Sequence, residues 1–317
     1  MGPKENLLRA IGHDRPAYVP RGNEGVMAGV QYAGNFRIDT WTDAWGTRWE
    51  TTREDMVPFP KGNPLPDLSR IGEYEAPDPH AMFDADEVLA GQMAGIPRRE
   101  EKLVFGQQVY FLFERAWALT GMENFMAAFY EHPDELKGLL RKITDYNIAV
   151  FERYIDLGVD GVGFSEDLGT QRALMISPAQ FREFFKPEYD RAFRVLKQAG
   201  KLVNFHSCGR VQEIVPDLIE VGVDILNPVQ ARANDLAEVK RLAADKLALM
   251  GAIDTHEVLM LGTPQQVEAE VKRVLGLLAP GGGYIIGPDQ GMPFPPENIE
   301  ALWRAAERWG VYPLAVG

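Results

Sequence analysis

The sequence predicts an α/β protein, a closed (β/α)₈ TIM barrel with an irregular N-terminal extension, and three observations favour that fold. Amphipathic helical patterns alternate with short apolar runs from about residue 100 onward. The apolar runs are almost continuous, which is typical of parallel strands covered on both faces. The helix-to-strand joints also repeat, since residues 154–160 (YIDLGVD) parallel residues 218–224 (LIEVGVD). At 317 residues a closed barrel fits better than the alternative, a doubly wound sheet.

Four helices are predicted from apolar residues that recur at i, i+3, i+4 and i+7. Their apolar faces lie within residues 136–150, 181–196, 211–219 and 267–278. Pro187 should kink the second helix, because proline lacks the amide donor that the helix interior requires. The strands between the helices are expected at residues 161–164, 202–205, 224–226, 247–250 and 284–286.

Residues 1–100 are rich in Pro, Gly and Trp and have few periodic patterns. We therefore expect residues 1–317 to form a single domain, in which the first 100 residues cover one end of the barrel. Trp41, Trp45 and Trp49 suggest either a substrate lid or packing of this segment, and packing is the favoured interpretation.

The composition excludes several classes of partner. Lys and Arg number 33 against 46 Asp and Glu, giving a net charge of −13 that argues against binding to nucleic acid or an anionic membrane. The single cysteine excludes an intrachain disulfide and fits a reducing, cytoplasmic location. The chain has no run of 18 apolar residues and no signal-peptide pattern at its start.

His206 and Cys208 are the first candidate metal ligands. They follow an apolar strand at positions i and i+2, so both side chains should project from the same face. Imidazole and thiolate together suit Zn²⁺. The alternative is a small buried cysteine beside a hydrogen-bonded histidine, and at this stage the two interpretations carry equal weight.

Other polar residues also follow predicted strands, and the ends of parallel strands share one rim of a barrel, where active sites form. These residues are Glu166, Asp167, Asn227, Gln230, Asp254, Asp289 and Gln290. Glu166 and Asp167 are adjacent, so their side chains should diverge. At most one of the two would then join a metal, while the other acts as an acid/base or contacts the substrate. Both could instead cap the segment 169–172.

The chain resembles the uroporphyrinogen decarboxylase superfamily and, within it, the corrinoid-linked methyltransferases. The stretches that carry the resemblance are residues 43–46, 165–171, 205–209, 222–230, 251–254 and 295–299, with 6–15 and 19–20 near the start. The resemblance implies a (β/α)₈ barrel with an N-terminal extension.

Two departures from the family pattern narrow the expected function. The arginine-rich segment by which true uroporphyrinogen decarboxylases bind tetrapyrrole carboxylates is replaced by residues 19–25 (VPRGNEG), with Arg21 alone. The zinc methyltransferases use His-x-Cys, here His206 and Cys208, and a later second cysteine whose place falls near Gln290. A third ligand could then be an oxygen from Glu166 or Asp289, which would make a harder site.

The resemblance implies a methyltransferase that moves a methyl group from a small methylated substrate, of methoxy or methylamine type, to a corrinoid. Zn²⁺ held by Glu166, His206 and Cys208 would act as a Lewis acid. Glu166 and Asp167 would be catalytic, and the remaining rim residues would bind the substrate. The chain has no corrinoid-binding motif of the Asp-x-His-x-x-Gly kind, so the corrinoid would arrive on a partner protein.

Two other functions stay open at this stage. One is a metal-independent decarboxylase that acts on a small carboxylated substrate, and the other is a non-catalytic barrel that serves as a scaffold. The several polar groups expected on one rim favour an enzyme over the scaffold. The sequence also leaves a homodimer open.

Overall fold

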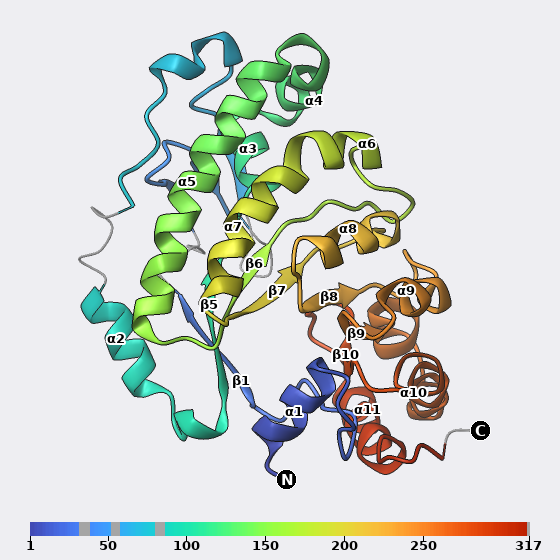
Figure 1. The fold of residues 1–317 in the computed structure, drawn as a ribbon. Helices are drawn as coiled ribbons and strands as arrows, with labels where there is room; N and C mark the ends of the chain where they lie inside the picture. The colour runs from blue at the N-terminus through green and yellow to red at the C-terminus, as the bar shows by residue number, and fades with distance from the viewer. Residues whose placement is uncertain (32–38, 52–57, 80–85, 316–317) are drawn as a thin grey trace.

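The computed structural model describes residues 1–31, 39–51, 58–79 and 86–315. Its centre is a seven-stranded parallel sheet in the order β1-β5-β6-β7-β8-β9-β10, curved into a TIM-barrel-like fold with helices around it (Figure 1). The strands are β1 (Met27–Gln31), β5 (Leu103–Gln108), β6 (Gly161–Ser165), β7 (Leu202–His206), β8 (Ile225–Val229), β9 (Ala248–Ile253) and β10 (Tyr284–Pro288). The predicted fold class is therefore confirmed.

The expected eighth strand is reduced to a bridge within the described residues. Arg21 forms a single parallel bridge with Ile286 of β10. The backbone amide of Gly22 donates to the Ile286 carbonyl at 3.0 Å, and the Ile286 amide donates to the Pro20 carbonyl at 2.9 Å. Residues 20–22 thus lie where a closing strand would pair with β10.

Helices pack around the sheet in the order that the periodic patterns predict. The α-helices are α1 (Pro3–Ile11), α2 (Asp86–Gly95), α3 (Phe113–Thr120), α4 (Met122–Glu131), α5 (Pro133–Leu157), α6 (Pro178–Gln180), α7 (Lys186–Gln198), α8 (Val215–Glu220), α9 (Leu236–Ala243), α10 (Pro264–Leu278) and α11 (Pro296–Trp309). Near Pro187, where a kink is expected, the structure has a π-helical turn, Phe181–Phe185, directly before α7. Pro187 thereby occupies the first turn of α7, where its missing amide costs no helical hydrogen bond.

Aromatic side chains fill the space between β5–β7 and the helices α5 and α7. The ring centroids of Phe164 and Phe193 lie 4.8 Å apart, and those of Phe111 and Phe164 lie 4.9 Å apart. All three side chains are almost completely buried. Close-packed rings of this kind change position only at a large cost, so the strands that carry the rim residues are held rigidly.

The N-terminal segment is more regular than its sequence suggests. Besides β1, it contains the antiparallel sheet β2 (Thr40–Thr42), β3 (Arg48–Glu50) and β4 (Phe59–Gly62). The Asp43 carboxylate accepts a hydrogen bond from the Trp49 indole at 2.9 Å. It also forms an ion pair with Arg115 of α3 at 2.6 Å. Trp45 and Trp49 are buried, as the packing interpretation predicts. The ion pair between Asp43 and Arg115 and the buried Trp side chains therefore join this small sheet to the barrel.

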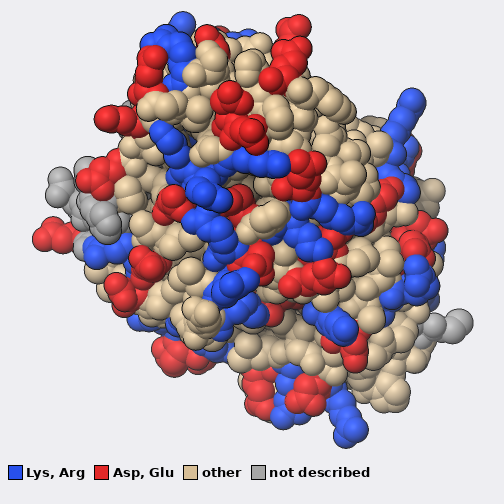
Figure 2. Space-filling model, turned by 45° about the horizontal axis from the view of Figure 1, so that its top comes forward, with Lys and Arg blue, Asp and Glu red and all other residues tan. Residues whose placement is uncertain are grey.

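Charged side chains of both signs are mixed on the face shown in Figure 2, where Lys and Arg lie among Asp and Glu. Ion pairs link neighbouring helices, such as Lys186 with Asp217 at 2.8 Å and Lys137 with Glu183 at 2.7 Å. The Lys137–Glu183 pair is exposed and should contribute at most about 1 kcal/mol, whereas the carboxylate of Asp217 is buried. Within the described ranges, none of the helices combines the length and apolar character needed to cross a bilayer.

We expect residues 1–100 to unfold together with the barrel, because Trp45, Leu65 and Leu89 belong to the same hydrophobic core as the barrel residues. Calorimetry should give one cooperative transition. Asp43→Ala should lower the stability in that single transition by about 2–3 kcal/mol, since it leaves the Arg115 charge without its partner. As a control, Glu73→Ala removes only an exposed partner of Arg70 and should change the stability by less than about 0.5 kcal/mol. Two separate transitions would contradict this expectation.

Candidate metal centre

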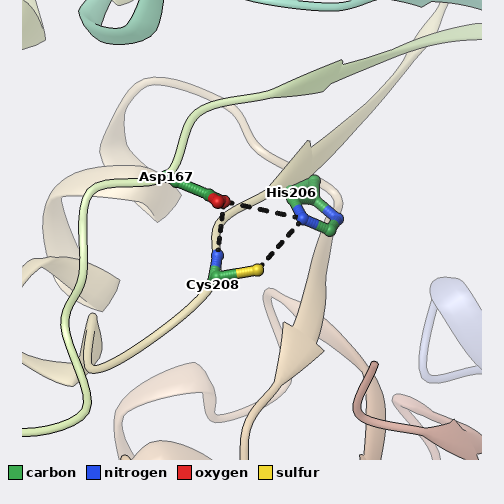
Figure 3. A group of neighbouring side chains, drawn as sticks. All are labelled: Asp167, His206 and Cys208. Carbon is green, nitrogen blue, oxygen red and sulfur yellow. Dashed lines mark hydrogen bonds and ion pairs between the residues drawn. The ribbon is translucent and has the colours of Figure 1, made fainter. Parts of the chain in front are cut away.

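Three potential ligands converge at the C-terminal ends of β6 and β7: Asp167, His206 and Cys208 (Figure 3). Their ligand atoms all lie within 4.8 Å of one another. His206 Nε2 is 3.5 Å from Cys208 Sγ and 3.6 Å from Asp167 Oδ1. Tetrahedral zinc, with bonds of about 2.0–2.3 Å, places neighbouring ligand atoms about 3.4–3.6 Å apart. The two distances from His206 Nε2 therefore match the spacing around a zinc ion, and the sulfur and the carboxylate oxygen lie within 4.8 Å of each other.

Asn227 fixes the orientation of the histidine ring. Its side-chain oxygen lies 3.1 Å from His206 Nδ1, and its amide nitrogen donates to the Asn204 side chain. With the amide assigned in this way, Nδ1 must carry the proton and donate it to Asn227. Nε2 then keeps its lone pair and faces the thiol and the carboxylate. A hydrogen bond of this kind on the far nitrogen is the usual support of a metal-binding histidine.

The environment of Cys208 shows what the thiol needs in order to ionise. Burial, followed by the negative charge of Asp167, raises the pKa of Cys208 to about 12. Gln290 donates a hydrogen bond to Sγ at 3.3 Å, which partly opposes this shift. At neutral pH the free thiol is therefore protonated. A bound cation would supply the charge that stabilises a thiolate here, so the donor set fits a metal such as zinc.

Glu166 lies outside this cluster, in contrast to its predicted role as a metal ligand. The side chain is fully buried, and one oxygen accepts hydrogen bonds from the backbone amides of Leu112 and Phe113 at 2.7 and 2.8 Å. The Tyr189 hydroxyl donates to the same oxygen at 2.8 Å, and the amide of Glu114 donates to the other at 3.0 Å. Asp167 takes the place that the sequence assigns to Glu166.

The position of Glu166 has a structural explanation. The helix α3 begins at Phe113, and the first amides of a helix have no partners within it. The carboxylate of Glu166 satisfies three of these amides and also carries the charge that a helix N-terminus favours. Burial raises its pKa to about 7, while the backbone and Tyr189 hydrogen bonds oppose that shift. Glu166 thus joins α3 to the end of β6.

Three other predicted site residues hold loops together. Gln230 accepts from the amide of Gly209 at 2.8 Å, and Asp289 accepts from the amides of Ala231 and Thr255, both at 3.0 Å. Asp254 caps the π-helical turn Thr255–Met260 through the amides of His256 and Glu257, at 2.8 and 2.9 Å. These side chains follow the strands, and each of them has at least one polar atom bonded within the protein.

Asn227 and Gln290, by contrast, line a pocket of about 390 Å³ beside His206. The other lining residues are Gly22, Asn23, Pro228, Met250, Gly251, Gly287, Pro288, Gly291, Met292, Phe294 and Trp303. Gln290 therefore lies between the pocket and the sulfur, near the position where the resemblance leads us to expect a second cysteine. This volume can hold a small organic substrate next to the metal ligands.

Two residues near the centre were not predicted from the sequence. Asn204 interrupts an apolar strand, and its polarity there could have indicated a hydrogen bond to a side chain of the next strand, which is Asn227. Glu114 lies on α3 and accepts from the Ser165 hydroxyl at 2.9 Å. Burial, followed by the charges of Asp167 and Glu166, holds the pKa of Glu114 well above its ordinary value. Burial therefore favours the protonated form of Glu114, a hydrogen-bonding side chain beside the centre.

The sequence profile described as "Uroporphyrinogen decarboxylase (URO-D)" matches residues 113–309, more than half of the chain. The chain therefore belongs to the uroporphyrinogen decarboxylase family. The matched region contains every potential ligand of the candidate metal centre.

Individual relatives are more distant. The methylcobamide:CoM methyltransferase MtaA of Methanosarcina barkeri is 26% identical over 193 residues, which cover 60% of this chain and 54% of that protein. A uroporphyrinogen decarboxylase of Nocardia farcinica is 32% identical over 152 residues, covering 48% of this chain and 40% of that enzyme. The chain thus spans about half the length of the curated relatives it matches. A solved methyltransferase from Methanosarcina mazei has the same fold, with a TM-score of 0.74, 19% identity, and coverage of 97% and 99% of the two chains.

The hydrogen bonds of Glu166 lead to a prediction about stability. Glu166→Gln should lower the free energy of unfolding by about 2–3 kcal/mol, because its NH₂ group would face a backbone donor in a buried site. Asp167→Asn is the matched control, since this side chain is 45% exposed and the variant keeps the oxygen that accepts from Cys208. We expect a change below about 0.5 kcal/mol for it. Urea unfolding of metal-free protein provides the measurement, and equal destabilisation of both variants would contradict the assignment.

Proposed function

We propose that the protein is a corrinoid-linked methyltransferase that takes a methyl group from a small methylated substrate. The observation that carries the proposal is the convergence of Asp167, His206 and Cys208, in which the two distances from His206 Nε2 match the separation of ligand atoms around tetrahedral zinc. Three ligands leave a fourth position open, as in catalytic rather than structural zinc sites. The similarity to MtaA supports methyl transfer between a cobamide and a small molecule, although the name of that protein gives the cobamide as the methyl donor and the present proposal makes the corrinoid the acceptor.

Each residue near the centre has a distinct task in this proposal. Asp167, His206 and Cys208 hold the zinc, Asn227 keeps Nε2 free to bind it, and Gln290 donates to the sulfur. Zinc, when bound, would withdraw electron density from the atom that carries the methyl group and make that atom a better leaving group. The pocket positions the substrate so that the methyl group points toward the open rim.

The transfer itself requires no external oxidant or reductant. The bond between the methyl carbon and its oxygen, nitrogen or sulfur breaks, and its electron pair stays on that heteroatom, which later takes a proton from water. The electron pair of cob(I)alamin forms the new bond between cobalt and carbon. Because the cobalt must approach the methyl group, we propose that a corrinoid-binding partner protein docks over the rim at the strand ends.

A decarboxylase is the second candidate, since the family also includes uroporphyrinogen decarboxylases. Such an enzyme needs cationic groups that bind substrate carboxylates. The described residues that line the pocket include neither Arg nor Lys. This lining favours methyl transfer over decarboxylation of a polycarboxylate.

Methyl transfer can be tested with reduced cob(I)alamin and a panel of methoxylated aromatics, methylamines and betaines. We expect metal-replete protein to form methylcobalamin, followed by its absorbance, and to contain zinc by elemental analysis. Cys208→Ala should lose the zinc and slow transfer by roughly 10²-fold or more. Asn227→Ala should weaken zinc binding by roughly 10–100-fold, because the histidine loses its fixed tautomer.

Asp254→Asn serves as the control for these variants. Asparagine also caps helices, and this residue holds a loop rather than the metal, so the variant should keep both zinc and activity. A negative result with free cobalamin is to be repeated with corrinoid proteins encoded beside this chain. Full activity of Cys208→Ala would overturn the role of the metal, and release of CO₂ without methyl transfer would establish the decarboxylase instead.

A further inference from the structure

The helix α1 covers the end of the barrel at which the strands begin, opposite the metal centre (Figure 1). Its residues Leu7 and Ile11 are buried in one hydrophobic cluster with residues from several strands. Among these are Leu103, Ile225 and Ala248, which are the first residues of β5, β8 and β9. The contacts that hold α1 in place therefore decide whether this end of the barrel stays closed.

His13 fixes the C-terminal end of α1 to the turn 281–283, which precedes β10. Its ring lies directly against Gly283, where an added Cβ would be 1.9 Å from His13 Cε1, so only glycine leaves room for the ring. Next to this contact, the Gly283 amide donates to the Ala10 carbonyl at 2.9 Å. His13 also has a left-handed backbone conformation, with φ at 53°, which a residue other than glycine keeps only where its surroundings hold it. The seat of the ring is therefore specific.

The surroundings of the ring suit its uncharged form. Nε2 is buried and has no hydrogen-bond partner among the described residues. The Lys240 ammonium of α9 acts on the ring as a like charge, and it donates to the Gly282 carbonyl at 2.9 Å. Burial, followed by the charge of Lys240, lowers the pKa of His13 below its ordinary value of 6.5. A hydrogen bond with the Leu247 backbone and the charge of Asp245 oppose this shift without cancelling it.

The other charged groups around the ring provide little compensation for a proton. Asp245, in the loop after α9, is exposed and has the smallest effect on His13 of the groups that act on it. Asp14 and Arg15 follow His13, are both exposed and are opposite in sign. The turn 281–283 consists of glycine and has no ionisable side chain. A proton on the seated ring would thus place a second cation beside Lys240 without an acceptor for Nε2, which is costly.

We propose that His13 is a pH-sensitive latch for α1. When the ring takes up a proton, it leaves its seat on Gly283, and the C-terminal end of α1 detaches from the barrel. The released ring is hydrated and keeps its proton easily, so protonation favours release. Because the pKa of the seated ring lies below 6.5, docking of α1 is strongest above this pH and weakens as the pH falls. One proton can raise the opening constant by at most about tenfold per pH unit.

Hydrogen–deuterium exchange of the full chain tests the latch, with protection factors corrected for the intrinsic exchange rate at pH 7.5 and pH 5.5. We expect the amides of α1 and of Gly283 to lose protection by about threefold or more at the lower pH, while those of α5 keep theirs. His13→Asn cannot titrate, and asparagine tolerates a positive φ. In this variant the protection of α1 should agree at the two pH values within about twofold.

Two further variants separate the latch from a general effect of acid. His256→Asn replaces a histidine that is 66% exposed at the opposite end of the barrel, so it should keep the pH response of the unaltered protein. Lys240→Met removes the like charge and keeps an apolar stem, so it should reduce the ratio of the protection factors at the two pH values, whatever its effect at either pH alone. The proposal is overturned if α1 of the unaltered protein is equally protected at both pH values. It is also overturned if His13→Asn loses as much protection as the unaltered protein, or if Lys240→Met leaves the ratio unchanged.

Discussion

The pairing of β6 with β7 and of β7 with β8 determines where each part of the metal centre lies. Ser165 pairs with His206 across β6 and β7, and His206 pairs with Asn227 across β7 and β8. This register brings Asp167, two positions after Ser165, beside Nε2 of the imidazole. It also places Asn227 against the other ring nitrogen, Nδ1. A shift of one residue would turn these side chains to the opposite face. The register of these strands therefore sets the distances between the potential ligand atoms.

The residues around the centre maintain this register by using their polar groups within the protein. Glu166 satisfies the start of α3, Gln230 binds the loop after Cys208, and Asp289 joins the loops after β8 and β9. Such fully bonded buried groups give a rigid support and few free polar atoms. Because these polar groups are hydrogen-bonded within the protein, the walls of the neighbouring pocket are mainly apolar.

The sequence predicts the parts of this architecture that depend on periodicity. Apolar runs locate β6–β10, and the i, i+2 rule correctly places His206 and Cys208 side by side. The strands β1 and β5 are not predicted from the sequence, because they lie in or next to a segment without clear periodicity. The eighth strand also fails to form within the described residues, because only Arg21 bridges to β10.

The choice between Glu166 and Asp167 illustrates the limit of sequence reasoning at the site. The sequence indicates that adjacent acids must diverge, and they do. Which of them faces the thiol depends on where α3 begins, because the free amides of that helix capture Glu166. Helix starts depend on tertiary packing, which a local pattern does not contain. For the same reason, the sequence suggests that Asp254 and Asp289 bind a ligand at the rim, whereas in the structure their carboxylates accept hydrogen bonds from loop amides.

Zinc K-edge X-ray absorption of the loaded protein tests the central claim most directly, because it counts the ligands by element. We predict one sulfur at about 2.3 Å and nitrogen or oxygen ligands at about 2.0–2.1 Å. Cys208→Ser should replace the sulfur contribution with oxygen or lose the metal altogether. A zinc site without sulfur, or one with two sulfurs, would contradict a centre built from Asp167, His206 and Cys208.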